Sequence, residues 1–280
     1  MMERAGQIAL GAALVVAVIG CKANKHVDAA AAVTFDGAEV TDPVALRAHG
    51  ERLSYVLGCR GCHGKDLQGQ KWDDDPKQWG VMWSSNLTRA IPAMSDAQLE
   101  ALLRQGVHPV RGDLWMMPSE LFQHLSAPDM AALIAHLRSI PASGVASPPP
   151  AQGPLALREV AAGHYKPAQQ MVAQYRTVLP ADAGPKFAQG RYITSVTCAE
   201  CHGMLLEGGT TPEGTIPNLI VASGYSPAEF DLFITTGTVP GGRKINHLMV
   251  SVAQSRFSHL APSERRELYG YLVARAALPQ

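Results

Sequence analysis

Five cysteines are distributed along the 280-residue chain as one, two and two. The last four form two motifs of the same type, "CRGCH" at residues 59–63 and "CAECH" at residues 198–202. Each motif holds two thiols with two residues between them and an imidazole directly after the second thiol. A disulfide would leave the imidazole without a role, and nothing else in the chain offers the further thiolates of a structural zinc site. The spacing therefore indicates a group that takes two thiols and one imidazole together.

C-x-x-C-H is the attachment motif of c-type haem. Its two thiols add across the two vinyl groups of the porphyrin, and the adjacent imidazole reaches the iron. Two copies in one chain predict two covalently bound haem c groups. The residues predicted to hold them are Cys59, Cys62 and His63 for the first group, and Cys198, Cys201 and His202 for the second.

The sequence repeats well beyond the two motifs, as expected when a whole domain is duplicated. "HGKDLQG" at residues 63–69 parallels "HGMLLEG" at residues 202–208. Two longer pairs of segments align without gaps, 95–109 with 226–240 and 122–137 with 257–272. We therefore predict two units with the same order of elements.

The aligned segments are predicted to be helices. In the first pair, a serine is followed three residues later by Gln or Glu, which is the capping box that satisfies the free N–H groups of a helix start. Apolar residues recur on one face of each segment. A glycine after the last periodic residue is typical of a helix end. These residues are Ser95, Gln98 and Gly106 in the first copy and Ser226, Glu229 and Gly237 in the second.

This order of elements resembles the class I cytochrome c domain. It is similar, more narrowly, to the dihaem and trihaem cytochrome c subunits of bacterial periplasmic dehydrogenases for alcohols, aldehydes and sugar acids. The second copy departs from the pattern, since Asn218 has no following Thr in register and Met249 is followed by Val. The resemblance implies an all-α fold of two tandem class I cytochrome c domains joined by a Pro-rich linker. The residues that carry it are the C-x-x-C-H-G openings, Asn86-Leu87-Thr88, Met117-Pro118 and "FQHLSAPDMAALIAHLRSIP".

The segments between the copies and before them lack a core-forming pattern. "PASGVASPPPAQGP" at residues 141–154 is rich in Pro, Gly and Ser, a composition typical of extended linkers. The predicted boundaries are 1–20 for a lipoprotein signal peptide, 21–44 for a tether, 45–141 for the first cytochrome c domain, 142–180 for a linker with helical potential, and 181–280 for the second domain.

The N-terminus indicates export. Residues 8–19, "IALGAALVVAVI", are apolar or small, and as a helix they would span only about 18 Å, too short for a bilayer core of about 30 Å. Their length suits a secretory signal peptide. The following "VIGC" resembles the bacterial lipoprotein box, which implies that Cys21 is lipidated and tethers the mature protein to the periplasmic side of a membrane. An ordinary signal peptide with an incidental cysteine is the alternative.

A haem built for electron transfer usually has a second ligand on the other side of the iron, most often a methionine thioether. Met117, directly before Pro118, and Met249 stand at matching places in the two copies and are the predicted ligands. Met116 is the alternative to Met117, and His247 is the alternative in the second copy.

Three further histidines are alternative ligands, and His124 and His259 are the best alternative pair because they align with each other. His124 and His259 align with each other in the same F-x-H-L frame beside an apolar face, for which we predict a structural or surface role. His108 follows a predicted helix end.

A histidine that binds iron needs an acceptor for its other ring N–H, because this bond fixes the orientation of the ring. In class I cytochromes a backbone carbonyl from a proline serves, and the resemblance assigns this role to Pro217 in the second copy. Ser85 is the matching residue in the first copy and still offers a carbonyl. Nearby, Trp72, Trp79 and Trp83 can pack against a haem edge, bond to a propionate, or fill the core.

The function expected from the sequence is electron transfer without a catalytic residue. Lys plus Arg and Asp plus Glu number 24 each, a balance that argues against nucleic acid as a partner. The expected partners are redox proteins, with a dehydrogenase as donor and a terminal oxidase or another cytochrome as acceptor. A membrane quinone is the alternative acceptor. A dihaem peroxidase or oxidase with one open iron is the alternative, against which each copy offers a methionine in register. A redox or gas sensor is a third class, but the chain has no signalling domain.

Overall fold

The computed structural model describes residues 32–211 and 214–279. The predicted signal peptide, the predicted lipidation site Cys21 and the first part of the predicted tether lie outside these residues. Residues 32–280 form one compact unit. Within the described part of the chain, no helix is long and apolar enough to cross a membrane.

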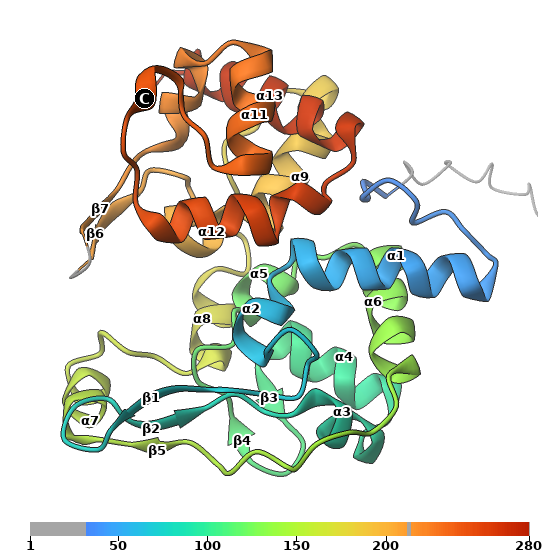
Figure 1. The fold of residues 1–280 in the computed structure, drawn as a ribbon, viewed down its shortest axis with the longest axis vertical. Helices are drawn as coiled ribbons and strands as arrows, with labels where there is room; N and C mark the ends of the chain where they lie inside the picture. Colours follow the sequence, from blue (N-terminus) through green and yellow to red (C-terminus); the bar gives the residue numbers. More distant parts are fainter. Residues whose placement is uncertain (1–31, 212–213, 280) are drawn as a thin grey trace, which may run out of the picture. The chain divides into compact units, whose positions relative to one another are not determined.

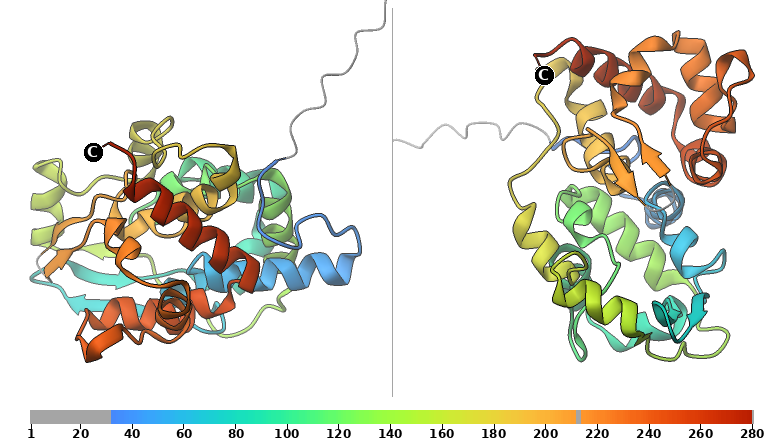
Figure 2. Two further views of the ribbon diagram at one scale, coloured as in Figure 1. Left: turned by 90° about the horizontal axis from the view of Figure 1, so that it is seen from above. Right: turned by 90° about the vertical axis from the view of Figure 1, so that its left-hand side faces the viewer.

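In the part of the chain that the structure describes, helices predominate and three small antiparallel sheets accompany them (Figure 1, Figure 2). The predicted all-α class is therefore right for the main elements but omits the strands. The sheets are formed by β1 (Lys71–Asp75), β2 (Gly80–Trp83) and β5 (Ala151–Gln152); by β3 (Val107–His108) and β4 (Gly112–Asp113); and by β6 (Gly209–Thr211) and β7 (Gly214–Ile216).

The motif helices and the longer helices follow the same order in the two copies, whereas the short elements between them differ. The first copy has α1 (Pro43–Val56), α2 (Cys59–His63), α3 (Leu87–Ala90), η1 (Ile91–Ala93), α4 (Asp96–Gln105), α5 (Ser119–Phe122) and α6 (Ala127–Ser139). The second copy has η2 (Pro185–Phe187), α9 (Ala188–Val196), α10 (Ala199–His202), η3 (Leu219–Gly224), α11 (Pro227–Thr236), η4 (Pro240–Gly242), α12 (His247–Ser255), η5 (Phe257–His259) and α13 (Pro262–Ala276).

Both predicted capping boxes are confirmed. Ser95 Oγ accepts from the Gln98 N–H at 3.2 Å, and Gln98 Oε1 accepts from the Ser95 N–H at 2.8 Å. Ser226 and Glu229 make the same pair of bonds at the start of α11, at 3.3 and 2.8 Å. The glycines that end α4 and α11 both have left-handed backbone conformations, which a side chain would disfavour.

Each copy packs its first helix across its last. In the α1–α6 pair, a Cβ added to Gly50 would overlap the carbonyl of Ala132. In the α9–α13 pair, a Cβ added to Gly190 would overlap the carbonyl of Glu267. Glycine at each crossing therefore allows the two helix backbones to approach closely, and the same device serves both copies.

The segment predicted as a linker is folded onto the first copy. Residues of β5 pair with β2, with Gly80 opposite Gln152 and Val81 opposite Ala151. Asn86 donates from Nδ2 to the Ser143 carbonyl at 2.8 Å and to the Val145 carbonyl at 2.9 Å. Two helices follow, α7 (Pro154–Ala161) and α8 (Ala168–Gln174), the second of which contacts α4 and α5.

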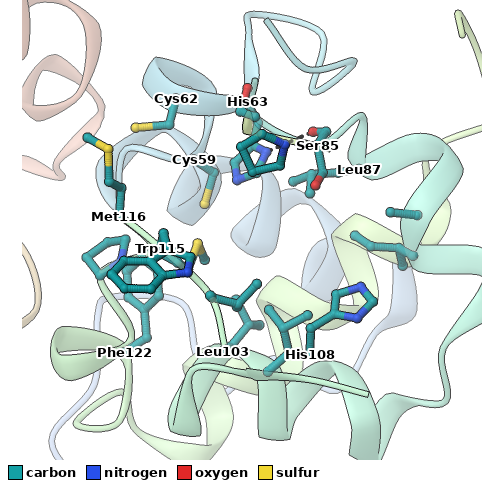
Figure 3. Close-up of a pocket in the computed structure, with 18 of the residues that line it drawn as sticks. Cys59, Cys62, His63, Ser85, Leu87, Leu103, His108, Trp115, Met116 and Phe122 are labelled. Atoms are coloured by element: carbon teal, nitrogen blue, oxygen red, sulfur yellow. Dashed lines mark hydrogen bonds between the residues drawn. The ribbon is translucent and has the colours of Figure 1, made fainter. Parts of the chain in front are cut away.

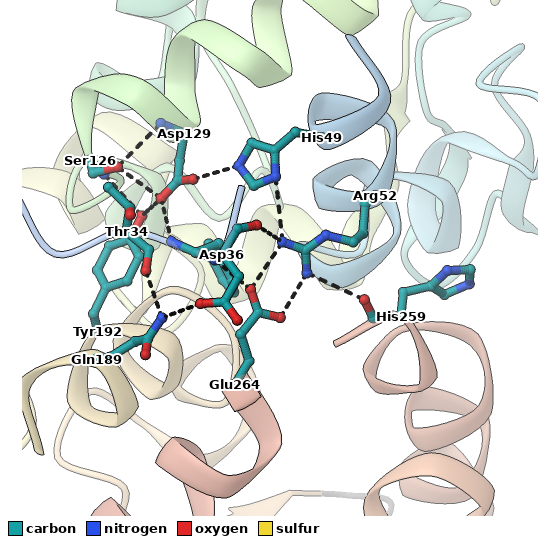
Figure 4. Close-up of polar contacts among 11 residues, drawn as sticks. Thr34, Asp36, His49, Arg52, Ser126, Asp129, Gln189, Tyr192, His259 and Glu264 are labelled. Atoms are coloured by element: carbon teal, nitrogen blue, oxygen red, sulfur yellow. Dashed lines mark hydrogen bonds and ion pairs between the residues drawn. The ribbon is translucent and has the colours of Figure 1, made fainter. Parts of the chain in front are cut away.

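The end of the predicted tether is also part of the fold (Figure 4). Phe35 is fully buried, and its ring meets that of Tyr192 edge to face at 5.4 Å between centroids. The Phe35 N–H donates to Asp129 Oδ2 at 3.0 Å, and the Asp36 N–H donates to Glu264 Oε1 at 2.8 Å. Residues 35 and 36 therefore bond to the last helix of each copy.

Two buried carboxylates join the copies directly (Figure 4). Asp129 on α6 accepts from the hydroxyl of Tyr192 on α9 at 2.7 Å. Glu264 on α13 accepts from Arg52 on α1, at 2.7 Å from Nη1 and 3.0 Å from Nη2. Neither carboxylate has exposed surface. The hydrophobic core is likewise continuous through both copies, so the two units are joined by more than the segment between them.

Candidate functional site

The first C-x-x-C-H motif forms the short helix α2, directly after α1. His63, its last residue, is held by a hydrogen bond of 2.9 Å between Nδ1 and the carbonyl of Ser85. Because a carbonyl can only accept, Nδ1 carries the proton and Nε2 keeps a lone pair that can bind a metal. Burial lowers the pKa of His63, although the bond to Ser85 opposes this shift, so the ring is neutral at neutral pH.

The second motif has the same geometry. His202 is buried, and its Nδ1 lies 2.9 Å from the carbonyl of Pro217. Burial lowers the pKa of His202, and the bond to Pro217 opposes the shift. Both acceptors predicted from the sequence are therefore confirmed, and both histidines present the same nitrogen for a ligand.

The loop after each motif repeats an uncommon backbone conformation. Leu67 and Leu206 have φ angles of 58° and 62°, values that a leucine rarely adopts. Both side chains are fully buried. The Leu67 carbonyl accepts from the Leu87 N–H at 2.8 Å, and the Leu206 carbonyl accepts from the Leu219 N–H at 3.0 Å. This bond in each copy anchors the loop to the segment that carries the histidine's acceptor.

A cavity of about 300 Å³ lies beside the first motif (Figure 3). Cys59, Cys62 and His63 form one wall, and Figure 3 shows Leu103 and Phe122 across the cavity from them. Most of the remaining lining is apolar, with Leu57, Leu87, Leu99, Leu102, Met117 and Leu137 among its residues. Two thiols and a neutral imidazole facing an apolar cavity fit a flat hydrophobic group bound through its edge and its metal.

The four motif cysteines are free thiols rather than disulfides. Burial raises the pKa of Cys59 to about 11, and it raises the pKa of Cys198 to the same value. Both groups therefore remain protonated at neutral pH. Within residues 32–211 and 214–279, no three His, Cys, Asp or Glu side chains gather to form a metal site of their own.

Both candidate methionines of the first copy line the cavity. Met117 is partly buried and packs against the hydrophobic core. Met116 is 46% exposed, with φ at 59°, and Figure 3 shows it at the edge of the cavity near Cys62. The structure thus brings both residues to the cavity, and Met117 is the more buried of the two.

In the second copy, both candidates lie on α12. Met249 is partly buried and packs against the core, whereas His247 is exposed. His124 and His259, for which we predict a structural or surface role, both make contacts within the protein. His124 Nε2 lies 3.2 Å from the Tyr175 carbonyl, and His259 stacks on Tyr55 at 4.1 Å between centroids.

Sequence reasoning missed a polar part of the cavity wall. His108, Arg111 and Asp113 line it from β3, β4 and the turn between them. His108 Nδ1 accepts from the N–H groups of Val110 and Arg111 at 3.1 and 3.2 Å, so its proton is on Nε2. The alignment of the two copies could have indicated this polar wall, because His108 aligns with the apolar Val239.

The predicted tryptophans divide between two roles. Trp72 and Trp83 line the cavity, whereas Trp79 packs edge to face on Tyr165 at 5.6 Å between centroids.

A comparison with protein-family models finds no match, and a comparison with curated proteins finds no significant match either.

Proposed function

We propose that the protein is a dihaem c-type cytochrome, made of two class I cytochrome c domains, that carries single electrons. The observation that supports this most is the duplicated bond from a motif histidine to a backbone carbonyl, His63 to Ser85 and His202 to Pro217. A disulfide or a thiol redox pair has no use for a histidine held in this way. Metal-binding histidines commonly have such a partner on the other ring nitrogen.

Each side chain of the first site has a definite task in this proposal. Cys59 and Cys62 hold the haem covalently, and His63 Nε2 binds the iron. Met117 supplies the second ligand, and the apolar wall limits the access of water. When bound, the haem supplies a one-electron couple whose potential depends on its ligands and surroundings. The protein itself holds and orients the haem and shields it from water.

The second site uses Cys198, Cys201 and His202 in the same way, with Met249 as the second ligand. We further propose that the protein works in the periplasm, tethered to a membrane by a lipid on Cys21. Its proposed partners are a dehydrogenase as electron donor, and a quinone, a terminal oxidase or another cytochrome as acceptor. The lipid would keep the protein close to partners in the membrane.

A dihaem peroxidase is the second candidate, and His108 is the observation that favours it. Its imidazole is at the cavity wall with the proton on Nε2. An imidazole beside an open iron can act as a general acid or base. This function requires that no methionine closes the first site.

Spectroscopy of the purified protein distinguishes the two functions. A carrier with Met117 and Met249 as ligands has two low-spin irons, shows the weak near-infrared sulfur-to-iron band when oxidised, and binds carbon monoxide poorly when reduced. A high-spin iron that binds carbon monoxide readily and turns over peroxide fast would support the peroxidase and contradict the carrier.

A further inference from the structure

Arg256 is a buried cation at the end of α12. Its side chain is only 11% exposed. Nη1 donates to Glu200 Oε2 at 2.7 Å, and Nε donates to the carbonyl of Val56 at 3.3 Å. Nη2 is buried and makes no hydrogen bond. A guanidinium held in this way costs free energy unless other interactions offset its loss of water.

The two partners of Arg256 belong to the two motifs. Val56 ends α1, just before the first motif, and Glu200 lies inside the second, between Cys198 and Cys201. A Cβ added to Gly58 would lie 2.5 Å from Cζ of Arg256, so the guanidinium also rests against the residue that precedes Cys59. Glu200, from the second copy, lines the cavity of the first. The guanidinium therefore lies between the two motifs.

The charge of Arg256 lies beside both motifs. The guanidinium rests against Gly58, the residue before Cys59, and it is bonded to Glu200, which lies between Cys198 and Cys201. Burial lowers the pKa of Arg256, but the charge and the hydrogen bond of Glu200, together with Cys201 and Cys59, raise it overall, so Arg256 keeps its own charge. One fixed positive charge thus acts on both motifs at once.

We propose that Arg256 is a shared electrostatic determinant of the two sites, which raises the reduction potential of a redox group held at either one. This rests on the proposed function. Reduction adds one electron to one site, and no bond forms or breaks. A nearby fixed positive charge favours the reduced form, which carries one positive charge fewer, and it does so more strongly where little water screens it. Glu200 partly offsets this effect at both sites.

The test measures both midpoint potentials in the full-length holoprotein by spectroelectrochemical titration. Arg256→Gln should lower both, each by about tenfold in the equilibrium constant for one-electron reduction, which corresponds to about 59 mV. Arg256→Lys keeps the charge and should restore most of the difference. Glu200→Gln should shift both potentials in the opposite direction, which provides a second test if Arg256→Gln folds poorly.

Arg265→Gln is the matched control. Arg265 is similarly buried and bonds to Asp231 Oδ1 at 2.6 Å, but its other partner is the Leu260 carbonyl rather than a motif residue. Its loss should leave both potentials nearly unchanged. A protein with two covalent haems in which the Arg256 and Glu200 variants shift neither potential, or only one, overturns the inference and leaves the proposed function standing. Wild-type protein without two haems overturns both.

Discussion

His63 and His202 each depend on one hydrogen bond for their orientation. The acceptors could be predicted, because a backbone carbonyl is present whatever the side chain, and Ser85 and Pro217 match in the repeat. The positive φ angles of Leu67 and Leu206 could not be predicted from the sequence. Leucine disfavours positive φ, and the full burial of both side chains overrides that local preference.

Arg256 shows a signal that sequence reasoning overlooked. In the alignment of 122–137 with 257–272, the residue before each segment is Leu121 in the first copy and Arg256 in the second. Leu121 is buried, so the repeat places a charge where its other copy has a core residue. The charged residue at this position could be seen in the alignment. Its partners could not be predicted, because Val56 and Glu200 are distant from Arg256 in the sequence.

Single substitutions distinguish Met117 from Met116 as the ligand at the first site. Met117→Ala should remove about half of the near-infrared sulfur-to-iron band of the oxidised protein, because Met117 is the more buried of the two candidates. Met116→Ala, which alters the exposed neighbour, should leave the band intact. The opposite result, with the band halved by Met116→Ala alone, would assign the ligand to Met116.

Among the elements, the helices with local signals were predicted best. The capping boxes of α4 and α11 and the glycines that end them lie within a few residues of the helices they specify. The strand β5 gave no such signal. It is only two residues long and depends on backbone pairing with β2, more than sixty residues earlier in the chain. Its Pro-rich surroundings indicated an extended backbone, but they did not indicate the strand with which it pairs.

The crossing of α1 and α6 predicts the effect of a single methyl group. Gly50→Ala places its Cβ against the Ala132 carbonyl, so the two helices must separate, at a cost of about 1–3 kcal/mol in the free energy of unfolding. Denaturant unfolding of the holoprotein measures the loss.

Gly270→Ala, inside α13, is the control for this substitution. The nearest atoms to its new Cβ are at ordinary contact distance, 3.9 Å away on Phe187. Because alanine is the better helix former, by about 1 kcal/mol, this variant should be unchanged or more stable. Equal destabilisation by both substitutions would contradict the close-approach role of Gly50.

At the scale of the whole molecule, the contact between the copies follows the repeat. Asp129 and Glu264 align with each other, and aligning Gly50 with Gly190 pairs Arg52 with Tyr192. Asp129 bonds to Tyr192, and Glu264 bonds to Arg52. Equivalent residues thus exchange equivalent contacts, as in an isologous interface. Composition alone predicted a tether and a linker, because contacts between distant segments leave no local pattern.

The interface predicts that both copies unfold together. Glu264→Ala leaves Arg52 without its buried partner and should cost about 3–5 kcal/mol. Scanning calorimetry should show one transition in the wild type, and a lower or divided one in the variant. The control is Asp231→Asn, which removes the exposed carboxylate of the ion pair with Arg265 and should change the transition little. Two separate transitions in the wild type would contradict a shared interface.

The number of covalently bound haems shows most directly whether the protein is a dihaem c-type cytochrome. The protein is produced with a cytochrome c assembly system, denatured, and weighed intact by mass spectrometry, which removes any haem that is not covalently attached. The expected mass is that of the chain plus two haems. It should fall to the chain plus one haem when either Cys59 and Cys62 or Cys198 and Cys201 are replaced by serine. A wild-type mass with one haem or none would contradict it.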